Sequence, residues 1–150
     1  MDLILWRHAE AETGAADLDR RLTAKGIRQA QRMGAWLDSR LPDKSRILVS
    51  PAERAQQTAR AANRKFKTID ALAPGASVAA VLAAARWPDA SEPVVIVGHQ
   101  PTLGMVASFL LDGEEAPWSV RKAVIWWLTN RHREGGSTVA VRCVIAPEFL

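Results

Sequence analysis

The amino-acid sequence predicts an α/β fold, a single-domain three-layer α/β/α sandwich with a mainly parallel sheet and an antiparallel C-terminal part. Short apolar runs alternate with segments whose apolar residues recur at helical spacing, which is the pattern of repeated strand–helix units. The last two apolar runs are instead joined by a glycine-containing turn, which predicts a hairpin. Because 150 residues can bury one sizeable core, we expect one domain over residues 1–150.

The N-terminal quarter of the chain predicts a strand followed by a helix. Residues 3–6 (LILW) form a short apolar run that ends abruptly in a cation and an imidazole, Arg7 and His8. After a polar loop, Thr23 occupies a position suited to capping a helix. The residues behind it place five apolar side chains at helical spacing: Ile27, Ala30, Met33, Leu37 and Leu41.

Residues 46–49 (RILV) predict the next strand, and the segment SPAE that follows predicts a helix start. Ser50 is expected at the N-cap and Pro51 at the first helical position, while Glu53 would complete a capping box. One face of this helix carries only small side chains, so the helix can pack close to the sheet. These residues are Ala52, Ala55, Ala59 and Ala62.

The second half of the chain predicts a weak strand at 66–69, a helix capped by Ser77, and a continuous apolar strand at 93–97 of the kind buried on both faces. A helix with Leu103, Val106, Ala107 and Leu110 on one face follows and ends at Gly113. Strands at 122–128 and 138–145 are joined by REGG at 133–136. Trp126 and Trp127 point to opposite faces of their strand, and we interpret both as packing residues.

Composition limits the partners that we expect. The chain is 48% apolar and 24% charged, ordinary values for a soluble globular protein. Its 20 basic and 16 acidic residues give a net charge of +4, but they are scattered, so we expect no nucleic-acid partner. No segment has the length of a membrane span or the pattern of a signal peptide. The single cysteine, Cys143, is interpreted as a small core residue, and these features together predict a cytoplasmic protein.

Three predicted strands end in residues that suit phosphate chemistry. The first ends in Arg7-His8, the second is followed by Arg54 in a helix start, and the third ends in Gly98-His99. Ligands of parallel α/β sheets bind outside the carboxyl ends of the strands, so these side chains are expected around one crevice. Two guanidinium groups suit a phosphate, a neutral imidazole can attack phosphorus, and a second imidazole can donate to a phosphoryl oxygen.

Other chemistries fit the sequence less well. His8, His99 and His132 lack short ligand spacing, and no cysteine or carboxylate cluster accompanies them, so no metal is expected. The sequence contains no Walker A motif, no G-x-G-x-x-G motif and no serine nucleophile elbow, and no cofactor is expected. We interpret His132, in the segment NRHREGG, as a solvated loop residue.

Four ordered segments between position 3 and about position 101 resemble the histidine phosphatase superfamily, with its phosphoglycerate mutase-like fold. They are LWRHAEAE, DRRLTAKGIRQA, SPAERAQQTA and VIVGHQP, and the similarity is greatest to the small SixA-like phosphohistidine phosphatases. The resemblance implies that His8 is a nucleophile that becomes transiently phosphorylated. It also implies that Arg7, Arg54 and His99 complete a metal-free phosphate pocket that would hold a phosphate or sulfate ion.

The resemblance has one departure and leaves two matching residues without a chemical role. The superfamily often has Arg-His-Gly where this chain has Arg-His-Ala, and Ala9 would be disfavoured only if its φ had to be positive. Arg21 and Gly26 match the family pattern, and we expect them to shape a loop and a helix start.

Cleavage of a phosphate ester expels an alkoxide and needs a general acid, and no residue is singled out for that role. The candidates are Glu10, Glu12, Asp17, Glu53 and Asp70. A phosphorylated imidazole has a better leaving group, and the chain has no room for a large lid over the pocket. We therefore expect a phosphatase acting on phosphohistidine of a protein. The alternatives are a phosphomonoesterase for a sugar phosphate or other small metabolite, and a non-catalytic phosphate-binding module.

Overall fold

A computed structural model of the chain describes the backbone of residues 1–150 and every side chain except that of Arg133. Six strands form one sheet in the order β3-β2-β4-β1-β5-β6. Four strands are mutually parallel: β1 (Asp2–Arg7), β2 (Arg46–Val49), β3 (Lys67–Thr68) and β4 (Val94–Gly98). The hairpin strands β5 (Ile125–Arg133) and β6 (Gly136–Ile145) are antiparallel, which confirms the predicted mixed sheet.

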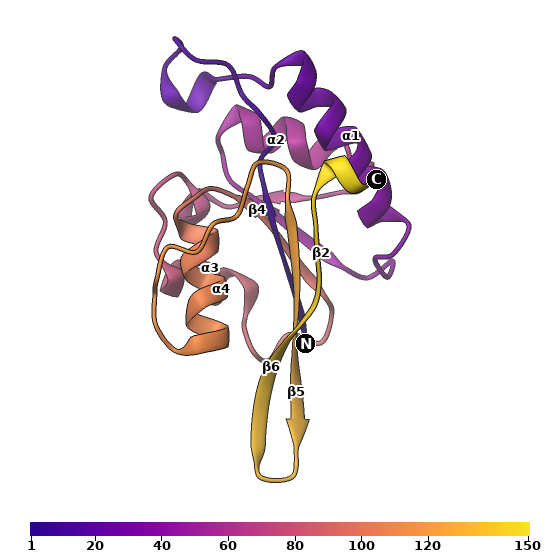
Figure 1. Cartoon of the computed structure of the whole chain (residues 1–150), viewed down its shortest axis with the longest axis vertical. Coiled ribbons are helices and arrows are strands. Elements are labelled where there is room, and N and C mark those ends of the chain that lie inside the picture. The colour runs from indigo at the N-terminus through magenta and orange to yellow at the C-terminus, as the bar shows by residue number, and fades with distance from the viewer.

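Two pairs of helices cover the two faces of the sheet, as Figure 1 shows. They are α1 (Ala24–Asp38) and α2 (Glu53–Arg60) on one face, and α3 (Val78–Ala85) and α4 (Thr102–Asp112) on the other. Alternate residues of β1 serve the two cores: Ile4 packs in the cluster of α1 and α2, and Leu5 in that of α3 and α4. This alternation follows from the two-residue period of a strand and confirms the three-layer α/β/α sandwich. Three short 3-10 turns complete the chain: η1 (Asp17–Asp19), η2 (Asp70–Leu72) and η3 (Pro147–Phe149).

Two of the three predicted helix caps are confirmed. The Thr23 hydroxyl accepts from the Gly26 N–H, and the Ser77 hydroxyl accepts from the Ala80 N–H at 3.0 Å. The predicted end of α4 is also confirmed, because Gly113 has a φ of 84° that favours glycine.

The capping box predicted for Ser50 and Glu53 is wrong. Helix α2 begins at Glu53, and its N-cap is Ala52, which makes no side-chain cap. Ser50 lies two residues earlier, because a bend at residues 51–52 separates β2 from the helix. Its hydroxyl accepts from the Ala52 N–H at 3.2 Å and bonds to His99, while Glu53 forms an ion pair with Arg60 at 3.3 Å.

Three further details differ from or refine the predictions. Ile27, predicted in the core, is 42% exposed on α1. His132, predicted in a loop, is an exposed residue of β5, because the hairpin pairs as far as its turn. Cys143, predicted in the core, is a half-buried residue of β6 that packs against the core. Its partner on β5, Trp127, is buried in the core, which confirms the predicted packing role of this tryptophan. The described chain contains no helix long and apolar enough to cross a membrane.

The register of the sheet brings three strand ends together. Arg7 pairs with Gly98, and Val49 pairs with Val97, so β1 and β2 end on the two sides of β4. The pairing continues one step past the strands, since the His8 N–H donates to the Gly98 carbonyl at 3.1 Å and the Ser50 N–H to the Val97 carbonyl at 3.0 Å. Residues 8, 50 and 99 therefore leave the sheet at adjacent positions.

Candidate active site

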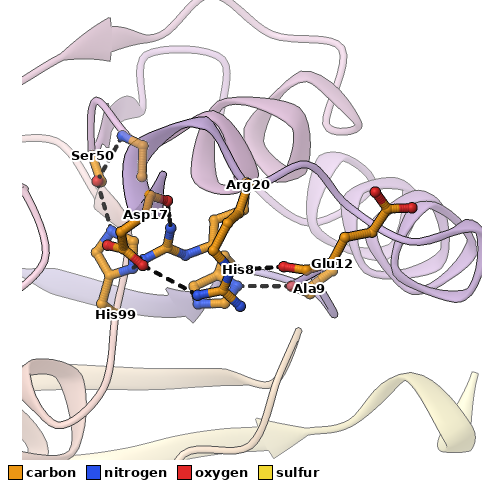
Figure 2. Close-up of polar contacts among 9 residues, drawn as sticks. His8, Ala9, Glu12, Asp17, Arg20, Ser50 and His99 are labelled. Carbon is orange, nitrogen blue, oxygen red and sulfur yellow. Dashed lines mark hydrogen bonds and ion pairs between the residues drawn. The ribbon is translucent and has the colours of Figure 1, made fainter. Parts of the chain in front are cut away.

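His8 follows β1 and is held with one ring nitrogen fixed by the backbone. Its side chain is buried, and Nδ1 lies 2.7 Å from the carbonyl oxygen of Ala9 (Figure 2). A carbonyl only accepts, so Nδ1 carries the proton and Nε2 carries the lone pair. Burial lowers the pKa of His8 to about 3, and the positive charges near it act in the same direction. His8 is therefore a neutral imidazole at neutral pH, with its lone pair on Nε2.

His99 follows β4 and lies beside His8, with 5.2 Å between the ring centroids. Its Nε2 is 2.7 Å from the Ser50 hydroxyl, as Figure 2 shows, and its Nδ1 is 3.4 Å from Nη2 of Arg54. A guanidinium only donates, so Nδ1 has the lone pair and Nε2–H donates to Ser50. Burial, and then the charge of Arg54, lower the pKa of His99 to about 4.

Arg54 and Arg7 make the pocket strongly cationic. Arg54, in the first turn of α2, is 4% exposed, and its Nη1 donates to the Asp17 carbonyl at 2.6 Å. Arg7 donates from Nη1 to the Val120 carbonyl at 3.0 Å, and burial together with the charge of Arg54 lowers the pKa of Arg7. The Nε atoms of both arginines are buried without a hydrogen-bond partner among the described residues. Two adjacent cations with unused donors suit an anion with several oxygens.

Of the five carboxylates considered as a general acid, Asp17 is the one whose side chain contacts a pocket residue within the described chain. Its carboxylate lies 3.3 Å from Nη2 of Arg54, and hydrogen bonds from Arg20 and the charge of Arg54 lower its pKa. Asp17 is thus an ionised acceptor. Glu10 accepts from the Thr23 hydroxyl at 2.7 Å and Glu53 pairs with Arg60. The Glu12 carbonyl binds Arg20, and Asp70 lies in η2.

Ser50 and Thr58 contact residues of the pocket, a role that was not predicted from the sequence. The buried Thr58 hydroxyl donates to the Arg54 carbonyl at 2.7 Å and accepts from the Ala9 N–H at 3.0 Å. It therefore ties the residue after His8 to the helix that carries Arg54. Both residues lie within SPAERAQQTA, one of the four segments that resemble the superfamily, and that resemblance could have indicated that they belong to the site.

The loop after His8 is fastened to the start of α1. The Thr23 N–H donates to the Glu10 carbonyl at 3.0 Å, and the Glu12 N–H donates to the Arg21 carbonyl at 2.8 Å. A Cβ atom at Gly26 would overlap the Glu10 carbonyl, so this close approach requires glycine. The expected structural roles of Arg21 and Gly26 agree with these contacts. Ala9 is fully buried and does not adopt a positive φ, so it fits without strain.

The described side chains include no group of three or more His, Cys, Asp or Glu residues arranged to hold a metal ion. The positive charge of the pocket comes from its arginines.

Comparison with known proteins decides the family. A family model for the histidine phosphatase superfamily (branch 1) matches residues 3–74. The phosphohistidine phosphatase SixA homolog of Haemophilus influenzae is 32% identical over 141 residues, which cover 83% of this chain and 85% of the relative. The chain belongs to the histidine phosphatase superfamily. Within it the chain is SixA-like: phosphohistidine phosphatase SixA of Escherichia coli is 29% identical over 133 residues, with 83% of each chain covered.

The fold agrees with this family assignment. A solved structure of the protein histidine phosphatase SixA complexed with tungstate has a TM-score of 0.78 and 26% identity, and covers 99% of both chains. The predicted phosphoglycerate mutase-like fold and histidine-phosphatase activity are thereby confirmed. The non-catalytic binding module is set aside, and this member of the superfamily is a phosphatase.

Proposed function

We propose that this histidine phosphatase removes phosphate from phosphohistidine on a protein, with His8 as the nucleophile. The observation that carries the proposal is the state of His8, a buried neutral imidazole whose Nδ1–H is bound to the Ala9 carbonyl and whose Nε2 is left to react. His99 and the arginines surround it. Two relatives bear the name phosphohistidine phosphatase, which supports the same substrate class.

The reaction would proceed in two transfers. Nε2 of His8 attacks phosphorus while the P–N bond to the substrate imidazole breaks, and the released imidazole takes a proton from solvent water. Water then attacks the phosphorus, the bond to Nε2 breaks, and inorganic phosphate leaves. Arg7 and Arg54 would hold the phosphoryl oxygens, for which Arg54 exchanges its Asp17 contacts. The negative phosphoryl group would raise the pKa of His99, whose Nδ1–H could then donate to an oxygen.

The proposed substrate class is supported by the lack of an evident proton donor among the described side chains of the pocket. Asp17 is ionised and paired with Arg54, so it is an acceptor as the pocket stands. An ester substrate would leave as an alkoxide and would depend strongly on a donor, whereas an imidazole leaving group depends on it less. The second candidate is a phosphomonoesterase for a sugar phosphate or other small metabolite. It predicts that one carboxylate-to-amide change removes most ester hydrolysis, at Glu10, Glu12, Asp17, Glu53 or Asp70.

Two coarser expectations accompany the proposal. We propose that catalysis is metal-independent, supported by the two arginines that supply the positive charge, and that activity persists in the presence of a strong chelator. A cytoplasmic location stays a prediction from the sequence.

The first test is to trap the phosphoenzyme with a reactive phosphate donor such as phosphoramidate. Mass spectrometry should locate the phosphate on His8, and NMR should show it on Nε2. His8→Ala should give no phosphoenzyme while keeping the native circular dichroism spectrum, and His132→Ala, a change of an exposed histidine, should behave as the wild type. Phosphate on another residue would contradict the assignment of His8. A preference for small esters over phosphohistidine by orders of magnitude would contradict the substrate class.

A further inference from the structure

A groove beside the active pocket gathers basic side chains. It consists of two adjoining hollows of about 430 and about 300 Å³, which share Lys25, Arg121 and Glu148 in their walls. The smaller hollow is also lined by Arg7, so the groove extends to one of the two arginines beside His8. We name it the basic groove after its six cations: Arg7, Lys25, Arg28, Arg32, Arg121 and Lys122.

Three parts of the chain supply these cations, and the first is the end of β1, which carries Arg7. Lys25, Arg28 and Arg32 lie at positions i, i+3 and i+7 of α1 and so share one face of that helix. Arg121 and Lys122 lie in the segment that enters β5, directly after Val120, whose carbonyl binds Arg7. The C-terminal turn η3, which contributes Glu148, lies next to α1 in Figure 1.

The basic groove accounts for the whole net charge of the protein. It contains six basic residues and two acidic ones, Glu10 and Glu148. The full chain has 20 basic and 16 acidic residues, so the fourteen of each sign outside the groove cancel. Basic side chains that are scattered along the sequence are therefore brought together on one surface by the fold.

Most of these cations are available to a partner. Lys25, Arg28, Arg32 and Lys122 are exposed, and none forms an ion pair with another described residue. The two carboxylates of the groove are already engaged. Glu148 pairs with Arg121 at 3.0 Å, and Glu10 accepts from the Thr23 hydroxyl.

We propose that the basic groove binds an acidic segment of the phosphorylated protein that the active site dephosphorylates. Exposed cations on a path to the reactive site attract an oppositely charged partner and orient it on approach. Carboxylates of a protein are discrete and can be placed to avoid Glu10 and Glu148. A nucleic-acid backbone or an anionic membrane presents unbroken negative charge and would meet both glutamates. The proposal rests on the proposed function, and it adds the recognition surface and the charge of the partner.

The test uses synthetic peptides with one phosphohistidine, flanked on one side by three Glu, three Gln or three Lys. At low ionic strength the Glu peptide should have a kcat/KM about tenfold above that of the Gln peptide, and the Lys peptide should be the poorest. The advantage should shrink at high salt because exposed charges are screened. Free phosphohistidine should show no such salt dependence beyond that of the pocket itself.

Matched variants place the effect in the groove. Lys25→Gln with Arg32→Gln and Lys122→Gln should abolish the preference for the Glu peptide and leave turnover of free phosphohistidine unchanged. The control, Lys44→Gln with Lys65→Gln and Arg131→Gln, removes the same number of exposed positive charges outside the groove and should keep the preference. Equal kcat/KM for the three peptides, or an unchanged preference in the groove variant, would overturn the proposal while leaving the phosphohistidine activity intact.

A binding measurement separates this proposal from the proposed function. Calorimetry with His8→Ala and the unphosphorylated Glu peptide needs no turnover. If His8→Ala binds this peptide and the same protein with the three groove substitutions does not, the result supports the basic groove. It does so even if phosphohistidine proves not to be the substrate. Absence of binding, or groove-dependent binding of anionic phospholipid vesicles or single-stranded RNA in preference to the Glu peptide, would count against an acidic protein partner.

Discussion

The two buried histidines should make the protein much less stable at pH 5 than at pH 7. Their pKa values are lowered from 6.5 to about 3 for His8 and to about 4 for His99, mainly by burial. In the unfolded chain both imidazoles take up protons as the pH falls below 6.5, whereas in the folded protein they stay neutral until about pH 4. The unfolded state therefore binds more protons over this window, and the free energy of unfolding decreases as the pH falls.

The size of the effect follows from these pKa values. At pH 5 each unfolded imidazole is mostly protonated and its folded counterpart is mostly neutral, which lowers the free energy of unfolding by about 2 kcal/mol per histidine. The two together remove about 4 kcal/mol, a large fraction of the roughly 5–15 kcal/mol that stabilises a typical domain. Asp2 and Asp17 have lowered pKa values, so their contributions are lost mainly at lower pH than this window.

Urea unfolding at pH 7, 6 and 5 in phosphate-free buffer measures this loss. His8→Gln and His99→Gln should each remove about half of the pH dependence, whatever they do to stability at pH 7. His132→Gln should leave the dependence unchanged, since His132 is exposed. Equal free energies of unfolding at pH 5 and pH 7 in the wild type would refute the reasoning. So would a decrease between pH 7 and pH 5 that is as large in His8→Gln and His99→Gln as in the wild type.

Three further predictions concern residues around the histidines. Arg54→Gln should cost about 2–4 kcal/mol of transition-state stabilisation, which lowers kcat/KM by a factor of about 30 to 900, and steady-state kinetics that stay near normal would contradict its role. Ser50→Ala removes the acceptor for Nε2–H of His99, so kcat/KM should fall about 3- to 10-fold and its pH profile should shift; an unchanged profile would separate Ser50 from catalysis. Thr58→Val leaves the buried Ala9 N–H unpaired and should cost about 1–3 kcal/mol in urea unfolding, unlike Thr138→Val at an exposed position.

Much of the fold was predictable because its signals are local. The strand at β4 is a continuous apolar run, and its five residues are buried. Thr23 and Ser77 cap helices at the positions that their sequence context indicates. The meeting of His8, His99 and Arg54 was also predictable, since it needs only the strand ends and the rule that parallel strands end at one edge.

The missed features depend on contacts between distant segments. Ser50 and Glu53 have the spacing of a capping box, but the bend after β2 moves the helix start and gives the Ser50 hydroxyl to His99, a residue 49 positions away. The contact between Asp17 and Arg54 likewise joins residues 37 positions apart through a loop. Spacing along the chain carries no information on which loop folds over the pocket. The concentration of charge in the basic groove was hidden for the same reason.

The hydrogen bond between the His8 ring and the Ala9 carbonyl makes the tautomer of His8 depend on the main chain. Every residue at position 9 has the same backbone carbonyl. Substitutions there would therefore test whether a larger side chain fits in the buried space around Ala9, and they would leave the proton on Nδ1 of His8. That explains how this chain can accept alanine where glycine is frequent in the superfamily. Only a change to the peptide bond itself would weaken the acceptor, such as a thioamide between residues 9 and 10 installed by semisynthesis. The His8 ring would then populate its other tautomer, with the proton on Nε2.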